Sequence, residues 1–233
     1  MQEQQKHFST QDGTSLFYRY RPAADGSSDK AIVLFHRGHE HSGRMMFVAD
    51  ELGFDDFAYF AWDARGHGHS PGERGDSPSI GTSVADVDDF IRHIQNEYGI
   101  KPENICVIAQ SVGAVLVSTW LHDYAPKIRC AVLASPAFKV KLYVPFARTG
   151  LKIMQKWRGN FFVNSYVKAH YLTHNKERQT SYDNDPLIAR AISVRILLGL
   201  YEAAERVVAD AQAITTPIQL LISGSDWVVH HKP

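Results

Sequence analysis

The sequence lacks the features of a secreted or membrane-spanning protein. Only two of its 233 residues are cysteines, Cys106 and Cys130, and both lie in apolar, strand-like runs. We therefore predict buried thiols in a reducing compartment. The first ten residues are polar, and no apolar run approaches the roughly 18 residues that a membrane-spanning helix needs. These absences predict a cytoplasmic protein whose contact with a membrane, if any, is peripheral.

The sequence also lacks a charge excess of either sign. It has 25 Lys and Arg against 25 Asp and Glu, so no overall field attracts nucleic acid. Its histidines are not grouped with carboxylates at the spacing of metal ligands, and we expect neither a metal nor a cofactor. A hydrophobic content of 44% and a charged content of 21% are ordinary for a globular protein. The length suits one α/β domain with an insertion.

Short apolar runs alternate with helical patterns through most of the chain. The expected strands are Lys6–Ser9, Ser15–Tyr20, Ala31–Phe35, Phe57–Trp62, Ile105–Ala109, Ile128–Ala134 and Pro217–Ser223. Asp12-Gly13 predicts a hairpin between the first two strands, and helical patterns cover residues 44–52 and 83–98. This order predicts a mostly parallel sheet covered by helices on both faces, with functional groups beyond the carboxyl ends of its strands. We expect a core over residues 1–136, a helical cap over 137–213 and a return to the core over 214–233.

The stretch ICVIAQSVGAVLVSTW, from Ile105 to Trp120, combines a strand, a sharp turn and a helix. Ser111 lies at the turn, with the small residues Ala109 and Gly113 two positions to either side. Such a turn exposes a serine hydroxyl beside the free N–H groups of a helix N-terminus, where an oxyanion can be stabilised. The pattern is that of a nucleophile elbow, G-x-S-x-G, with alanine in the first position. Taken alone, it also arises by chance in many chains.

Four patterns in register resemble the monoacylglycerol lipase and lysophospholipase-like branch of the α/β-hydrolases, which includes serine aminopeptidase-like members. They are His36-x-Gly38-x-Glu40-His41-Ser42-Gly43-Arg44, Asp63-x-Arg65-Gly66-His67-Gly68-x-Ser70, the turn at Ser111, and Asp185-Pro186-Leu187 followed by Ser223-Gly224-Ser225-Asp226. The resemblance covers almost the whole chain. It implies an α/β-hydrolase fold with a helical cap.

The resemblance also implies roles for individual residues. Ser111 would be the nucleophile, Asp226 would orient a base histidine, and the backbone N–H groups of Gly38 and Val112 would form the oxyanion hole. Arg37 stands where the family commonly has glycine, and it would contact the substrate. The second pattern would be a structural brace, in which His67 holds a loop by a hydrogen bond to the backbone.

One expected group has no clear place in the sequence. In this fold the chain order is Ser, then Asp or Glu, then His after a further helix and strand. Pro233 is seven residues past Asp226, and His230 and His231 are too near to Asp226 to reach Ser111. We therefore expect a fragment that lacks the last strand, the last helix and the base, and that is inactive for that reason. The alternatives are a domain that only binds a ligand and, more remotely, an unconventional base.

The predicted cap is locally basic and aromatic. Residues 136–176 contain eight Lys or Arg and no Asp or Glu, interleaved with aromatic residues. This composition suits an anionic membrane surface beside a site for lipid-like acyl esters, although an ordinary cap with buried aromatics would have a similar composition. We expect hydrolysis of a lysophospholipid or monoacylglycerol, with thioester or amide cleavage as alternative chemistries. Nucleic-acid binding is disfavoured because no recognition motif is present.

Overall fold

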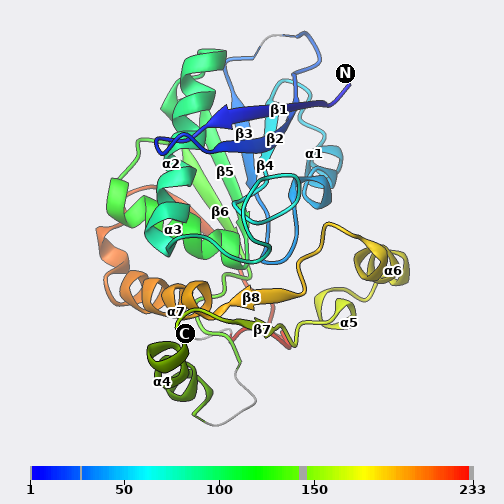
Figure 1. Cartoon of the computed structure of the whole chain (residues 1–233). Coiled ribbons are helices and arrows are strands. Elements are labelled where there is room, and N and C mark those ends of the chain that lie inside the picture. Colours follow the sequence, from blue (N-terminus) through cyan, green and yellow to red (C-terminus); the bar gives the residue numbers. More distant parts are fainter. Residues whose placement is uncertain (1, 27, 142–145, 231–233) are drawn as a thin grey trace.

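A seven-stranded sheet forms the centre of the molecule (Figure 1). The computed structural model describes residues 2–26, 28–141 and 146–230. The strands lie in the order β1-β2-β4-β3-β5-β6-β9; β2 pairs antiparallel with β1 and β4, and the remaining pairs are parallel. Their bounds are β1 Gln4–Ser9, β2 Ser15–Arg21, β3 Ala31–Phe35, β4 Ala58–Trp62, β5 Ile105–Gln110, β6 Cys130–Ala134 and β9 Ile218–Leu221. The predicted α/β class and mostly parallel sheet are confirmed.

The parallel register brings the functional loops to one edge of the sheet. In β3, Phe35 pairs with Ala109 of β5, and Gln110 of β5 pairs with Ala134 of β6. The loop that starts at His36 and the turn at Ser111 therefore leave the sheet side by side at the carboxyl ends of their strands. This is the edge at which ligands bind in open α/β sheets.

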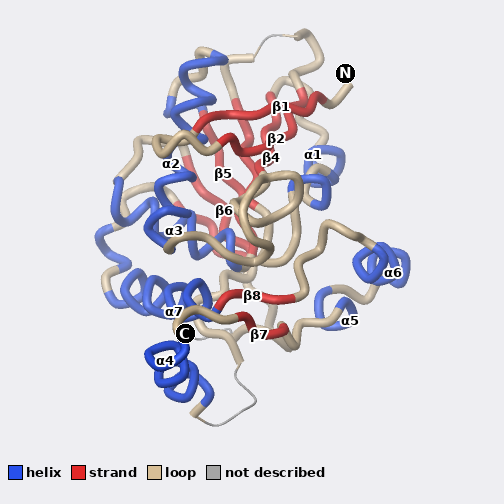
Figure 2. The backbone as a smooth tube through the Cα atoms, in the orientation of Figure 1, coloured by secondary structure: helices blue, strands red, loops and turns tan. Residues whose placement is uncertain are grey.

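Helices cover both faces of the sheet, but unequally (Figure 2). The larger core lies between the sheet and three helices, α2 (Ile80–Tyr98), α3 (Val112–Tyr124) and α7 (Val194–Ala209). The other face carries a smaller core under α1 (Phe47–Leu52). Helix α3 is apolar nearly all round, and its residues 113–121 are buried, as expected for a helix between the sheet and two other helices.

The two cysteines lie on the less covered face and correct the prediction of buried thiols. Cys106 and Cys130 pair across β5 and β6, are both partly exposed, and have their Sγ atoms 3.4 Å apart. They remain free thiols. The prediction failed because an apolar run identifies a strand without showing how completely a helix covers each face.

The segment between β6 and β9 lies over the carboxyl edge of the sheet, but it is not purely helical as expected. It contains α4 Ala147–Arg158, β7 Phe162–Asn164, α5 Ala169–Leu172, α6 Lys176–Asn184, β8 Ala191–Ser193, α7 and the short helix η3 Ala211–Ala213. Strands β7 and β8 form a separate antiparallel pair. Helix α7 belongs to the main core, because it packs against α2 and α3.

Strand β9 forms an outer edge of the described sheet and is exposed along its length. The apolar side chains of Leu220, Leu221 and Ile222 are 47–51% exposed. None of the helices in the described ranges is long and apolar enough to cross a membrane.

Candidate active site

Ser111 occupies a strained turn between β5 and α3. Its backbone has φ 54° and ψ −113°, a conformation that is costly for a residue with a side chain and that concentrates at functional sites. The turn is fixed by hydrogen bonds from Ser111 N–H to the carbonyl of Ala134 (3.0 Å) and from Ala137 N–H to the carbonyl of Ser111 (3.2 Å). The strain is thus held by β6 and the segment that follows it.

Gly113 allows α3 to approach the end of β3 closely. A Cβ atom at this position would lie 2.4 Å from the carbonyl oxygen of His36 and 2.9 Å from that of Phe35. No other residue fits this contact without movement of the backbone. The glycine two positions after Ser111 therefore positions the start of α3 against the loop that follows β3.

That loop brings Gly38 against Val112. A Cβ atom on Gly38 would lie 2.9 Å from Cγ2 of Val112, so the backbone of Gly38 packs closely against the side chain of Val112. Val112 is the first residue of α3, where N–H groups have no partner within the helix. The loop at Gly38 and the start of α3 therefore lie together next to Ser111, and all three line one cavity.

His36 connects this loop to the loop after β4. Its Nε2 accepts a hydrogen bond from Ala64 N–H (3.1 Å), so its Nδ1 carries the proton and donates to the carbonyl of Arg37 (2.8 Å). Burial lowers the pKa of His36, which keeps the ring neutral. His36 is therefore a positioning residue for the Gly38 segment.

The pattern from Asp63 to Ser70 forms the predicted brace. The buried carboxylate of Asp63 accepts from Ser42 N–H (2.6 Å) and His69 N–H (2.7 Å), and Arg65 forms a bidentate ion pair with Asp86. Nδ1 of His67 donates to the carbonyl of Arg65 (2.8 Å), as expected. These contacts hold the loop after β3 against the loop after β4.

A cavity of about 190 Å³ opens beside Ser111. Its walls include Arg37, Gly38 and Val112, so four of the five residues singled out from the sequence come together here. Most other wall residues are apolar and come from the cap and α7: Val140, Val163, Val167, Leu172, Ile192, Leu197, Leu200 and Tyr201. An apolar cavity with few polar groups suits a hydrocarbon chain.

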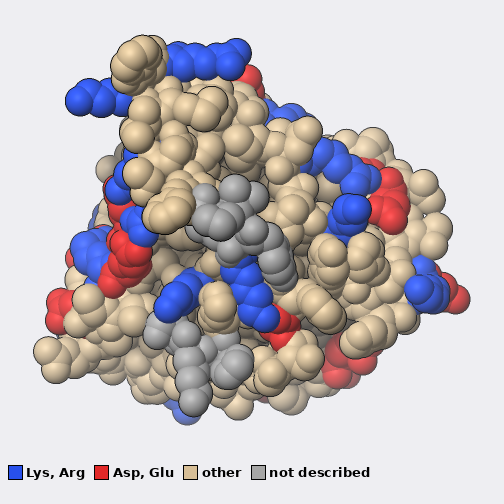
Figure 3. Space-filling model, turned by 90° about the horizontal axis from the view of Figure 1, so that it is seen from below, with Lys and Arg blue, Asp and Glu red and all other residues tan. Residues whose placement is uncertain are grey.

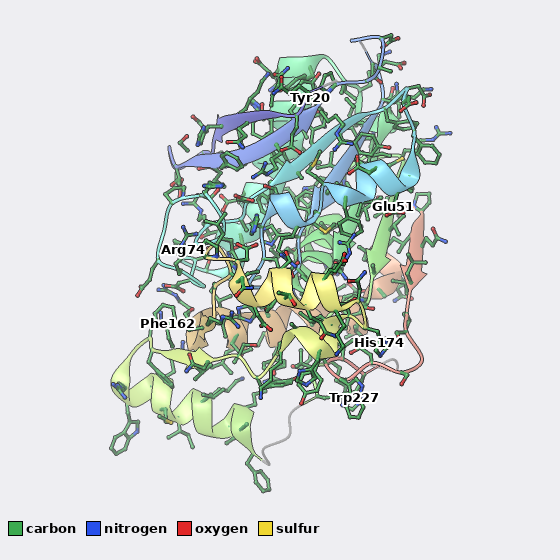
Figure 4. The ribbon with its side chains drawn as sticks, turned by 90° about the vertical axis from the view of Figure 1, so that its right-hand side faces the viewer. Tyr20, Glu51, Arg74, Phe162, His174 and Trp227 are labelled. Carbon is green, nitrogen blue, oxygen red and sulfur yellow. The ribbon has the colours of Figure 1, made fainter. Side chains whose placement is uncertain are left out.

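Asp226 lies in the loop after β9, close to this cavity but outside its described walls. Oδ1 of Asp226 accepts from Val228 N–H (2.7 Å) and Val229 N–H (2.9 Å), and Val228 lines the cavity. The carbonyl of Asp226 accepts from Nζ of Lys141. The neighbouring Trp227 approaches Tyr171 of α5, with ring centroids 6.2 Å apart, on the side of the molecule shown in Figure 4.

Three described histidines that follow β3 and β9 do not fit the role of the base. His230 lies in the wall of a different cavity, and its N–H donates to the carbonyl of Lys139. His41 donates to Asp185 (3.0 Å) while its Nδ1 accepts from Gly43 N–H. His39 lines the Ser111 cavity, but burial, and after it the nearby His67, lower its pKa to about 4. His231 lies outside the described residues.

Glu40 is a site residue that the sequence argument named only as part of a motif. It is 2% exposed, and its Oε1 accepts from Nη2 of Arg37 (2.6 Å) and from Nε of Arg44 (3.4 Å). Arg44 also reaches Asp185 (3.3 Å). The signal in the sequence was an acidic residue with arginines three positions before and four after it, a spacing that can bring charges together around one helical turn.

Comparison with known proteins identifies relatives of this architecture. The sequence model of the family "Serine aminopeptidase, S33" matches residues 26–233. YnbC of Escherichia coli strain K12 is 61% identical over 97% of this chain, which spans 39% of the length of YnbC. The monoglyceride lipase of Mus musculus is 30% identical, with 97% of this chain and 74% of the lipase covered.

Solved structures agree with the fold. The monoacylglycerol lipase of Paleococcus ferrophilus is 26% identical, with a TM-score of 0.73 over 95% of this chain and 77% of the lipase. A soluble variant of the monoglyceride lipase of Saccharomyces cerevisiae, solved with a substrate analogue, has a TM-score of 0.84 over 99% of this chain and 79% of that protein. At 14% identity the second likeness concerns the fold alone.

Proposed function

Because the chain belongs to the serine aminopeptidase S33 family of α/β-hydrolases, we propose that it cleaves carboxylic esters of lipid-like substrates through an acyl-enzyme on Ser111. The observation that carries this proposal is the strained, positive-φ backbone of Ser111 in the turn before α3, beside an apolar cavity. A serine held in this way is exposed to a substrate and lies next to unpaired helix donors. Its relatives include monoglyceride lipases, which supports an ester substrate.

In the proposed reaction Ser111 Oγ attacks the acyl carbonyl, and a histidine base takes the hydroxyl proton. The resulting oxyanion accepts hydrogen bonds from the N–H groups of Gly38 and Val112. Each such donor contributes roughly 3–4 kcal/mol in other hydrolases. The base then protonates the leaving alcohol, and water releases the acyl group from Ser111. Asp226 orients the base, and Arg37 contacts the part of the substrate that remains outside the apolar cavity.

We further propose that the base histidine lies outside the described residues. The histidines described near the sheet edge are already committed to backbone or carboxylate partners or have a strongly lowered pKa. On this proposal the 233-residue chain alone has little activity, because removing one triad member collapses the mechanism.

The substrate class follows from the shape and polarity of the site. A mostly apolar cavity next to Ser111 fits an acyl chain, and the polar groups around Arg37 fit an alcohol with hydroxyl or charged groups. We therefore propose a lysophospholipid or monoacylglycerol as substrate. The described residues contain no cluster of three or more His, Cys, Asp or Glu that could hold a metal ion.

We also propose that α4 contacts an anionic membrane surface. Phe146 and Trp157, at the two ends of α4, are 87% and 88% exposed, and Ile153 and Met154 are about half exposed. In Figure 3 Lys and Arg side chains lie on both sides of a projecting uncharged group at the edge of the molecule, with an acidic side chain beside them. Exposed aromatic and basic side chains on one helix suit a lipid headgroup region. Arg148 and Lys152 pair with Glu205 and Glu202 of α7, which leaves Lys156 and Arg158 as the proposed lipid contacts.

Hydrolysis of esters by the full-length protein tests the central proposal. A nitrophenyl ester, a monoacylglycerol and a lysophospholipid are compared for the wild type and for Ser111→Ala. We expect turnover of all three by the wild type and a loss of several orders of magnitude in the variant. The 233-residue chain serves as a separate arm: turnover equal to that of the full-length protein would contradict the proposed base outside the described residues.

A further inference from the structure

A second cavity, of about 280 Å³ and more polar than the first, lies directly beside the Ser111 cavity. Arg37 and Leu172 belong to the walls of both cavities. Gln110, the residue immediately before Ser111, also lines the polar cavity. A molecule whose ester bond lies at Ser111 can therefore place its acyl chain in the apolar cavity and its other end in the polar one.

The walls of the polar cavity carry more positive than negative charge. They contain three arginines, Arg37, Arg44 and Arg178, and one carboxylate, Glu40. Asp185, behind the wall, accepts a hydrogen bond from Arg44 and another from His41. Two carboxylates thus face three guanidinium groups, and at least one positive charge is not compensated by its neighbours.

The uncompensated charge belongs to Arg178, because Arg37 pairs with Glu40 and Arg44 pairs with Asp185. Arg178 has no ion pair with any carboxylate in the described part of the chain, and its guanidinium lies 4.0 Å from the centre of the Phe47 ring. Arg37 bonds Glu40 through Nη2, while its buried Nε has no partner among the described residues. An unsatisfied buried donor is unfavourable, so an anion that reached Nε would gain a strong, charge-assisted hydrogen bond.

We propose that this cavity binds a phosphate group carried on the alcohol part of the substrate. The inference rests on the proposed ester hydrolase function and narrows its substrate to acyl esters of phosphorylated alcohols, in preference to neutral monoacylglycerols. Guanidinium groups match phosphate because their N–H donors form a planar fork that engages two oxygens at once. The wall also contains Tyr182, whose pKa is raised by burial, so its phenol remains a neutral donor.

The test compares two substrates with the same acyl chain, a 1-acylglycerol 3-phosphate and a 1-acylglycerol, in the full-length protein. For the wild type we expect a higher kcat/KM with the phosphate ester. In Arg178→Gln we expect this preference to fall about tenfold, the equivalent of one weakened charge-assisted contact, because kcat/KM for the phosphate ester falls much more than kcat/KM for the neutral ester. Lys176→Gln is the matched control, since it removes a charge from the same helix outside the cavity wall.

The possible results distinguish a failure of the proposed phosphate subsite from a failure of the proposed ester hydrolase function. Equal kcat/KM for both esters, or the same preference in Arg178→Gln as in the wild type, contradicts the phosphate subsite while leaving an ester hydrolase. If the protein hydrolyses neither ester, the proposed ester hydrolase function itself is wrong. In a third arm, inorganic phosphate is titrated calorimetrically into Ser111→Ala. Binding of phosphate without any preference for the phosphate ester would mean that the cavity takes a free anion, and the substrate assignment would be wrong.

Discussion

At the scale of single residues, the site depends on close backbone contacts that few side chains can occupy. Gly113 meets the carbonyl oxygens of His36 and Phe35, and Gly38 meets Val112. Both contacts set the distance between the loop after β3 and the start of α3. A change of a few tenths of an ångström there would move the proposed oxyanion donors relative to Ser111, and the chemistry is sensitive to that distance.

Gly113→Ala tests this dependence. The added Cβ would lie 2.4 Å from a backbone oxygen, so the helix start must shift. We expect the overpacking to lower the free energy of unfolding by about 1–3 kcal/mol. We also expect kcat to fall, by a factor that corresponds to at least the same free energy. Gly150→Ala, where a Cβ has open space in α4, is the control. Denaturant unfolding and ester turnover measure the two effects; wild-type values in Gly113→Ala would contradict the proposed contact.

Histidines with a lowered pKa make stability depend on pH. Burial, followed by the nearby His36, lowers the pKa of His67 to about 4, against 6.5 for an ordinary histidine. Between these values the unfolded chain binds a proton that the folded chain does not. Stability is therefore complete above pH 6.5, is lost as the pH falls from 6.5 to about 4, and changes no further below that for this residue.

His67→Asn removes one of these groups while keeping a side-chain donor for the carbonyl of Arg65. We expect the loss of stability between pH 6.5 and 4 to shrink by roughly 1–2 kcal/mol relative to the wild type, after allowance for partial solvent exposure. Thermal unfolding across that pH range measures the effect. His7→Asn, on an exposed position of β1, controls for the removal of a histidine as such. If the stability of His67→Asn and of the wild type depended on pH in the same way, His67 would not be a source of this pH dependence.

At the scale of elements, a buried polar cluster links the cap segment to the core through hydrogen bonds and an ion pair. Ser193, the N-cap of α7, accepts from Ile196 N–H (3.2 Å) and donates to the buried carboxylate of Asp76. Arg195 pairs with the same carboxylate. The loop after β4, strand β8 and helix α7 therefore share one set of contacts.

Ser193→Ala should lower the free energy of unfolding by more than the loss of an ordinary helix N-cap does. Removal of a serine N-cap costs about 1 kcal/mol, and a buried carboxylate that loses a donor adds about 1–3 kcal/mol. Ser79→Ala is the matched control, because Ser79 caps α2 through Thr82 N–H (2.9 Å) and is exposed. Urea unfolding compares the two variants. Equal losses would show that the Asp76 contact does not stabilise the fold.

At the scale of the whole molecule, the positions of the main strands along the chain and the place of Ser111 in a strand-to-helix turn could be predicted from the sequence. Ala31–Phe35 is a continuous apolar run that the structure reproduces to the residue, and Asp12-Gly13 marks the hairpin between β1 and β2. Local chemistry determines this strand and this turn. A strand buried on two faces must be apolar throughout, and a tight turn needs a residue that accepts positive φ.

The cap and the exposure of individual strands could not be predicted in the same way. Strands β7 and β8 have three residues each, which is too short for an alternating pattern to stand out. Strand β9 is apolar yet exposed, and Cys106 is partly open, because burial depends on which helices cover a strand rather than on the strand itself. Pairing of Asp185 with His41 and Arg44 joins residues more than 140 positions apart, and no local pattern encodes it.

The exposed edge of β9 predicts binding of a hydrophobic dye and association between copies of the chain. Its apolar side chains stay in contact with water in the described structure, so the 233-residue chain alone should bind a hydrophobic dye and associate at its β9 edge. Leu220→Lys, at the 51% exposed position, is expected to reduce both effects without lowering the melting temperature. Light scattering and dye fluorescence measure them. Unchanged association in Leu220→Lys would contradict a role for this edge.

The account as a whole depends on the reactivity of one hydroxyl, and mapping of a covalent inhibitor tests it most directly. The full-length protein is treated with a fluorophosphonate, digested and analysed by mass spectrometry. We predict a single adduct on the peptide that contains Ser111, absent in Ser111→Ala and strongly reduced in Asp226→Asn. An intact protein that takes up no label, or that is labelled at another serine, would contradict the proposed ester hydrolase.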